Sequence, residues 1–321
     1  MYPATETGGG EILTFLMRRV AMTLFVLWGV VTVIFIVVRI VPGDPALTQL
    51  GPTATAVELD AFRERFGLNE PLLAQYFAFL RGAVVLDFGD SFRLGGDSMG
   101  HVLQRLPLSL ALAGTAMALA LAVSLPLGIL SAMKPGGFID RIASTSSLIV
   151  QGLPTFWVGI MLILLFARTL NVMPSGGAES WRHIVLPAIA LGLPLIGVIV
   201  RLVRSGLLET LREGYIQTAR SKGLSEGVVI SVHGLRNMLI PVVTVLGLQF
   251  GVLLGGAVVV EMVFSWPGLG RLLIDAIGNR DYPVVQAAVA TMAAVFVGLN
   301  LAVDLLYGVL DPRIQVGGKN A

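Results

Sequence analysis

The sequence predicts an all-α polytopic membrane protein with six transmembrane helices and an external subdomain after the first helix. Of the 321 residues, 55% are apolar and only 13% are charged. An ordinary soluble domain carries about 25% charged residues. Long uncharged runs alternate with polar loops, and about 20 apolar residues are enough to cross a bilayer. Composition and alternation together indicate a chain that crosses the membrane several times.

The composition also excludes several kinds of function. A net charge of +2 gives no reason to expect a nucleic-acid partner. The chain has no cysteine, which excludes a disulfide framework, a thiolate nucleophile and a cysteine metal site. The three histidines are far apart in the sequence, so we expect no metal site. The Gly-Lys pair near the C-terminus is followed by Asn320 rather than Ser or Thr, so there is no Walker A motif. Any ATP hydrolysis must belong to another chain.

The first apolar run predicts an uncleaved transmembrane helix over residues 18–41. Arg18 and Arg19 precede an uncharged stretch over 20–38 that is long enough to span. A signal peptide has the same beginning, but no small-residue cleavage site follows this run. Residues 1–17 are then expected to form a flexible cytoplasmic N-terminus.

Residues 42–105 form a long polar segment with an excess of acids, which agrees with an external location. Within it, 56–66 is typical of a short helix and 72–80 of an amphipathic helix. The segment could receive an external binding protein or act as a structural lid. The sequence leaves both interpretations open.

Five further apolar runs complete a transmembrane core over residues 106–314, before a short tail at 315–321. We expect these spans at 106–133, 142–167, 184–200, 237–260 and 283–303. The fourth is short and is loosened by Pro187 and Pro194. Basic residues favour one side of the short loops, which predicts that both termini are cytoplasmic.

A polar interruption over 201–236 separates the fourth and fifth spans, and the loop itself is expected over 205–237. Apolar residues recur there at every fourth position: Leu207, Leu211, Tyr215 and Ala219. This spacing predicts one apolar helical face. Gly223 is expected to end that helix. Ser225 is then a suitable N-cap for a second helix, with Glu226 in its first turn. Basic loops beside spans are common in any case, because positive charge stays cytoplasmic.

A few polar residues lie within or beside the spans. Four of them could line a translocation path: Gln151, Gln249, Asn300 and Asp304. They could equally make hydrogen bonds between helices. The remaining charges at span boundaries are interpreted as interface anchors that snorkel: Arg39, Arg168, Arg201 and Glu261. A titratable group near the middle of a span is absent, which disfavours a proton-coupled carrier.

The stretch GYIQTARSKGLSEGVVISVHGLRNMLIP over 214–241 resembles the cytoplasmic signature loop of binding-protein-dependent ABC importer permeases. It is most similar to the first permease subunit of the dipeptide/oligopeptide family. The general pattern is Glu-Ala-Ala, three residues and Gly, with Ile-x-Leu-Pro further on. Here Gln217-Thr218-Ala219 and Gly223 fill the first part, whereas only Leu235 of the second part is kept. Other similar stretches are VPGDP (41–45), FGLNEPLLAQY (66–76), LDFGDSF (86–92), LPTFWVGIML (153–162), EMVFSWPGLGRLLIDAI (261–277) and LDPRI (310–314).

The resemblance implies a type I ABC importer permease that forms half of a translocation pathway in a bacterial or archaeal inner membrane. The implied partners are a second homologous permease, two ABC ATPase subunits and an external solute-binding protein. This chain would bind no cofactor and catalyse no reaction, because ATP and Mg²⁺ belong to the ATPase subunits. Dipeptides or oligopeptides are the implied solutes, with glutathione, nickel chelates or sugars as alternatives.

In this family the signature loop is the coupling helix that docks on the ATPase, and residues 205–237 are called the coupling loop below. The positions that correspond are Tyr215, Gln217, Thr218, Ala219, Arg220, Lys222, Gly223, Leu224, Ser225 and Glu226. We expect Ala219, Gly223 and Leu224 to form the centre of the docking surface, with polar contacts from the charged residues beside them.

Two other classes of protein remain as alternatives. One is a secondary transporter or channel that works alone, which transport without any ATPase would favour. The other is a membrane-embedded enzyme, against which the lack of a metal or nucleophile site argues.

Overall fold

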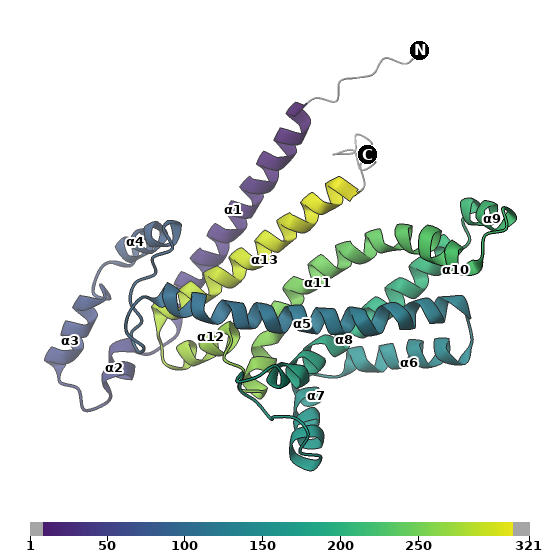
Figure 1. Ribbon diagram of the computed structural model, residues 1–321. Coiled ribbons are helices and arrows are strands. Elements are labelled where there is room, and N and C mark those ends of the chain that lie inside the picture. Colours follow the sequence, from purple (N-terminus) through teal and green to yellow (C-terminus); the bar gives the residue numbers. More distant parts are fainter. Residues whose placement is uncertain (1–8, 311–321) are drawn as a thin grey trace. The chain divides into compact units, whose positions relative to one another are not determined.

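The computed structural model describes the backbone of residues 9–310, and side chains over 17–303 except at 236–237 and 239–240. This described part consists of helices and loops without a named strand (Figure 1). Five of its helices are long and apolar enough to cross a membrane, or six when one bent pair counts as a span. The all-α membrane fold is confirmed. The chain divides into two compact units, Met1–Gln104 with Leu273–Ala321, and Arg105–Leu272.

The first unit is built on two long helices. α1 (Gly9–Ile40) and α13 (Tyr282–Leu310) pack along each other (Figure 1). The expected flexible N-terminus is therefore too long, because the helix already begins at Gly9. Residues 1–8, the tail at 315–321 and most of the 310–314 motif lie outside the described part.

Short helices make up the segment that the sequence predicts to be external: α2 (Pro45–Leu50), α3 (Ala56–Arg65) and α4 (Leu72–Val84). The two helices expected there are confirmed as α3 and α4. Thr55 and Glu58 form a capping box that starts α3. The segment is fastened to the start of α13 by the buried Asp281, which accepts hydrogen bonds from Ser91 Oγ (2.5 Å) and the Phe92 amide (3.0 Å).

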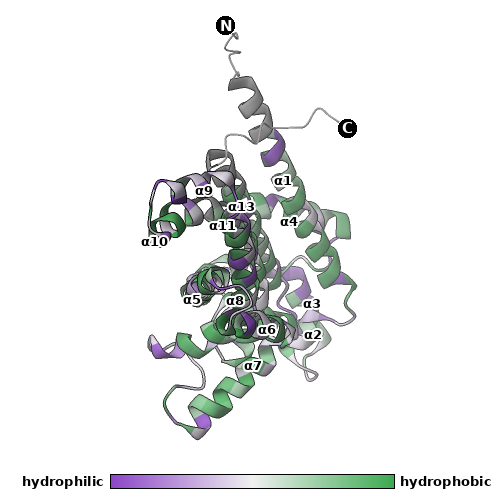
Figure 2. Cartoon of the chain, turned by 90° about the vertical axis from the view of Figure 1, so that its right-hand side faces the viewer, coloured by the Kyte–Doolittle hydropathy of each residue, from purple (hydrophilic) through white to green (hydrophobic). Residues whose placement is uncertain are grey.

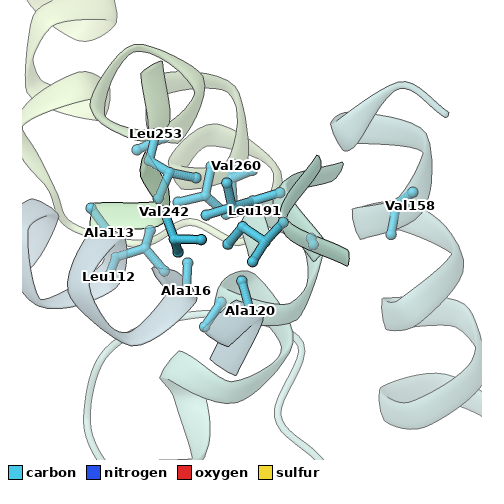
Figure 3. Packing of buried hydrophobic residues seen from close by; sticks show 14 of the residues in the cluster. Leu112, Ala113, Ala116, Ala120, Val158, Leu191, Val242, Leu253 and Val260 are labelled. Carbon is cyan, nitrogen blue, oxygen red and sulfur yellow. The ribbon is translucent and has the colours of Figure 1, made fainter. Parts of the chain in front are cut away.

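The second unit surrounds α8 (Arg182–Thr210), which packs against α6 (Phe138–Gly152), α7 (Thr155–Leu162) and α11 (Leu235–Val263). α5 (Ser98–Met133) joins the two units along the chain, as does α12 (Leu269–Gly278). Apolar colour runs along the long helices in Figure 2. Figure 3 shows part of the core, where small residues of α5 such as Ala116 lie beside Leu191 and Val242. Small side chains let such helices approach closely.

The third predicted span, 142–167, is wrong as a single helix. α6 ends at Gly152, and the direction changes by 103° before Thr155, where α7 and the π-helical η1 (Ile163–Thr169) begin. Pro154 explains the break. Proline has no N–H for the helix ladder, and it disfavours helical backbone at the residue before it. Leu153 accordingly has ψ 127°, which is extended.

The fourth span is longer than predicted. α8 continues ten residues beyond Val200 to Thr210, so Arg201 lies inside this helix and not at its boundary. Pro187 and Pro194 lie inside α8 without ending it.

Glu261 is not an interface anchor. It is fully buried in the last turn of α11, where its carboxylate accepts from Ser109 Oγ (2.5 Å) and the Arg271 amide (3.0 Å). These donors compensate its burial.

Candidate coupling loop and membrane path

The connection between α8 and α11 contains α9 (Gly214–Ser221), α10 (Glu226–Val228) and the π-helical η2 (Val229–Gly234). The single apolar face expected from Leu207 to Ala219 is wrong, because α8 stops at Thr210 and α9 starts only at Gly214. The non-helical residues between them change the rotational phase. Tyr215 is consequently 42% exposed, and its neighbour Ile216 is fully buried instead.

The coupling loop has a small core of its own. Ile216 and Val229 are fully buried and Ala219 is 6% exposed, and together they form a small buried cluster with Leu211 packed against it. The expectation that Ala219 belongs to the docking surface needs correction, because its side chain faces this cluster. The cluster holds α9 against η2 and makes the loop a folded element.

The turn after α9 is the predicted glycine turn. Gly223 has φ +78°, a left-handed backbone that suits glycine. Its N–H donates to Arg220 O (2.9 Å), and the Leu224 N–H donates to Ala219 O (3.4 Å). These two bonds form the Schellman motif, which ends helices by satisfying their last carbonyls. Ser225 occupies the N-cap position of α10, but its hydroxyl makes no capping bond.

The outer face of the loop mixes charge with apolar surface, and α9 shows polar colour in Figure 2. Arg220 grips Glu226 with two hydrogen bonds, from Nε to Oε1 (2.7 Å) and from Nη2 to Oε2 (3.1 Å). These bonds lower the pKa of Glu226 and raise that of Arg220. Leu224 and Val228 are each 40% exposed beside this pair. The remaining corresponding residues are also exposed: Gln217, Thr218, Lys222 and Ser225.

A buried ion pair lies where α8 leads into the loop. Asp140 of α6 is only 4% exposed, and its carboxylate binds both Nε and Nη2 of Arg204, the latter at 2.8 Å. The Gly136 N–H (2.7 Å) and Ser144 Oγ (3.3 Å) donate to the same carboxylate. This pair fastens α6 to the C-terminal part of α8. Sequence reasoning missed it, because 64 residues separate the partners and no local pattern links them.

Gln151 makes a second polar link between the same helices. Its Oε1 accepts from Arg201 Nη2 (2.5 Å), and its Nε2 donates to Ser147 O (2.9 Å). A Cβ placed on Gly197 would lie 2.5 Å from Ser147 O, so α6 and α8 meet closely here. These contacts agree with the interpretation of Gln151 as an interhelical hydrogen-bonding residue. Arg201 is part of this contact rather than a simple anchor.

The other path candidates lie on α11 and α13. Gln249 lies half-buried on α11, and no described residue hydrogen-bonds to its side chain. The buried Oδ1 of Asn300 on α13 also has no partner among the described residues. The side chain of Asp304 lies outside the described part. Gln151 and Gln249 belong to the second unit, whereas Asn300 and Asp304 belong to the first.

Comparison with known proteins accounts for almost the whole chain. Residues 124–316 match the family "Binding-protein-dependent transport system inner membrane component", and residues 12–113 match its N-terminal component. The glutathione transport system permease protein GsiC of Escherichia coli K12 is 39% identical, over 95% of this chain and 99% of that protein. The dipeptide transport system permease protein DppB of Alkalihalophilus pseudofirmus is 38% identical, over 95% of this chain and 100% of that protein.

Solved structures support the fold. An inward-facing structure of the MetNI methionine ABC transporter aligns with 66% of this chain and 97% of its own, with a TM-score of 0.54 and 19% identity. The sequence matches cover both units, and the structural match shows a similar helical fold over two thirds of this chain. The chain therefore belongs to the family of binding-protein-dependent transport system inner membrane components, the permease subunits of ABC importers.

Proposed function

We propose that this permease subunit imports short peptides and is driven by ATPase subunits that dock on the coupling loop. Both named relatives move peptides, since glutathione is itself a modified tripeptide. By the same relationship, the complex would contain a second homologous permease, two ATPase subunits that hold ATP and Mg²⁺, and an external binding protein. The solute class is tested by isolating that binding protein and measuring its affinity for dipeptides, longer peptides and glutathione.

The single observation that carries the docking proposal is the architecture of the coupling loop. A buried cluster of Ile216, Ala219 and Val229 supports a face on which apolar and charged side chains are exposed. Protein interfaces combine an apolar centre with a polar rim in this way. In this proposal Leu224 and Tyr215 contribute apolar contact, Arg220, Lys222 and Glu226 contribute polar contact, and Ala219 supports the surface from beneath.

Force applied to this face would reach the membrane helices through α8. The loop follows α8 directly, and the Asp140–Arg204 pair fastens α8 to α6. A displacement of α9 would therefore move α6 and α8 together. A β-branched side chain at Gly223 should interrupt this transmission at the loop, because a branched residue does not tolerate φ +78° and forces the turn to change.

The test compares three variants in proteoliposomes that contain the complete complex and its binding protein. Gly223→Val should abolish ATP-dependent uptake and the stimulation of ATPase activity by the binding protein. Gly223→Asn should keep much of both, since asparagine tolerates left-handed backbone. Gly227→Ala is the matched control, because a Cβ there meets nothing within 4 Å. Normal coupling in the valine variant would disprove docking at this turn, and uptake without any ATPase would favour a secondary transporter.

The proposed orientation, with both termini cytoplasmic, has a direct test because the chain has no cysteine. Single cysteines at Ser221 in the coupling loop and Val57 in α3 should lie on opposite sides of the membrane. In intact cells an impermeant maleimide should label only the Val57→Cys variant. Labelling of Ser221→Cys instead would invert the topology.

A further inference from the structure

The external segment leaves one apolar face of α4 uncovered. Residues at helical spacing form a stripe on it: Leu73, Phe77, Leu80 and Val84. Leu73 is 72% exposed, Phe77 65% and Val84 85%. A neighbouring face of α4 is covered, because the rings of Tyr76 and Phe79 pack against Phe35 of α1. Within the described part of the first unit, α4 therefore has one apolar face in use and another without a partner.

α4 lies beside a part of α1 that crosses the membrane. Tyr76 OH hydrogen-bonds with Thr32 Oγ1 at 2.8 Å, and Arg39 Nε donates to Gln75 Oε1 at 3.0 Å. The apolar span of α1 runs from Met17 to Ile40, so Arg39 lies at the level of the lipid headgroups. Thr32 is about 10 Å deeper, at 1.5 Å rise per residue. Because α4 contacts α1 at the depths of both Arg39 and Thr32, it must lie partly within the bilayer and not in the surrounding water.

A polar pocket of about 410 Å³ lies at this same end of α1. Two arginines line it, and they differ in their partners. Arg63 is neutralised, with Nη2 on Asp44 Oδ2 (2.5 Å) and Nη1 on Asp60 Oδ1 (2.6 Å). Arg39 lies over the Phe35 ring at 3.7 Å and has no acidic partner among the described residues. The pocket thus holds one cation without a counter-ion, at headgroup depth.

We propose that α4 is embedded in the leaflet at the C-terminal end of α1, and that the pocket binds the phosphate of a phospholipid. The guanidinium of Arg39 supplies the charge-assisted hydrogen bonds that phosphate recognition uses. The acyl chains of lipids in that leaflet cover the Leu73–Val84 stripe, as for interfacial amphipathic helices. Inorganic phosphate has the same chemistry for Arg39, but it leaves the stripe exposed to water.

The depth of α4 is tested first, by spin labels on single cysteines in the complex reconstituted into vesicles. The test sites are Leu73→Cys and Phe77→Cys, and Val57→Cys on α3 is the matched control because Val57 is 79% exposed. We expect the α4 labels to be accessible to oxygen and protected from a water-soluble nickel chelate, with the reverse at Val57. Access of the chelate to α4 would overturn the proposal. Protection from both reagents would also overturn it, since protein would then cover the stripe.

The phosphate site is tested by the thermal unfolding of the delipidated complex in mild detergent. Phosphatidylglycerol, phosphatidylcholine or inorganic phosphate is added at equal phosphate concentration. We expect both lipids to raise the unfolding temperature, and Arg39→Gln to need about tenfold more lipid for the same rise. Arg39→Lys should restore part of the response, and Arg81→Gln, on α4 outside the pocket, should behave as wild type. An equal effect of inorganic phosphate would indicate a small-anion site, and no lipid response in the wild type would refute the site.

Discussion

Two regions of the molecule each contain an arginine that donates two hydrogen bonds to one carboxylate. One region is the contact of α6 with α8, and the other is the coupling loop. The two ion pairs differ in burial. Asp140 is almost fully buried beside Arg204, and two further donors complete its hydrogen bonding. Arg220 and Glu226 are 41% and 59% exposed. Water can replace either partner of the exposed pair, whereas it has little access to the carboxylate of Asp140. The same chemistry therefore fixes helices in one region and leaves the other free to change partners.

The largest effect is expected from removing the buried carboxylate. Asp140→Ala leaves Arg204 and the Gly136 N–H without their acceptor, and should destabilise the protein by about 3 kcal/mol, the lower end for a broken buried pair because Arg204 is partly exposed. Unfolding in detergent with increasing denaturant measures this loss. The double variant Asp140→Ala, Arg204→Ala should recover part of it. If the single variant were as stable as wild type, the pair would not fasten the two helices.

A smaller loss of stability is expected when a larger side chain forces α6 and α8 apart. Gly197→Val places side-chain atoms against Ser147 O and Gln151, where a Cβ already meets atoms within 3 Å. Overpacking of this kind costs about 1–3 kcal/mol. Gly227→Val in the coupling loop is the matched comparison, because nothing lies within 4 Å of a Cβ there. Equal unfolding temperatures for the two variants would contradict the close approach of α6 and α8.

The link through Gln151 should contribute less. Gln151→Leu removes the acceptor of Arg201 Nη2 and is expected to cost about 1 kcal/mol, as is usual for interhelical hydrogen bonds in membranes. Uptake should continue at a similar rate if Gln151 serves packing. A strong loss of uptake with unchanged stability would instead place Gln151 on the translocation path.

The smallest effect concerns the exposed pair and depends on pH. The pKa of Glu226 is lowered in the folded loop, so the pair stabilises the loop above the ordinary glutamate pKa, and this contribution is lost as pH falls through the lowered value. The protection of the α9 and α10 amides against hydrogen exchange, corrected for the intrinsic pH dependence of exchange, should therefore fall in acid. Glu226→Gln should remove this pH dependence. The same acid response in both proteins would assign it to another group.

The sequence predicted what depends on local pattern. Length and apolar composition located most spans, and Gly223 marked the turn because only a few residues tolerate its backbone. Predictions failed where contacts with residues far away in the sequence determine a residue's environment. The polar interruption was expected to begin at Arg201, directly after the fourth span, whereas α8 continues through it and acceptors on α6 bind the side chains of Arg201 and Arg204. Tyr215 was placed on the buried face because the three-residue break after α8 has no strong signal of its own.

The break at Pro154 divides one apolar stretch into two pieces that are each too short to cross the bilayer. α6 has 15 residues, which is about 22 Å at 1.5 Å per residue. Its last carbonyls and the first amides of α7 therefore end inside the hydrocarbon layer, where lipid offers no hydrogen bond. Such ends must face protein or water. The main chain near Gly152 and Thr155 is therefore a stretch of polar backbone that lipid cannot cover, and the break fixes where this permease needs protein or water inside the hydrocarbon layer.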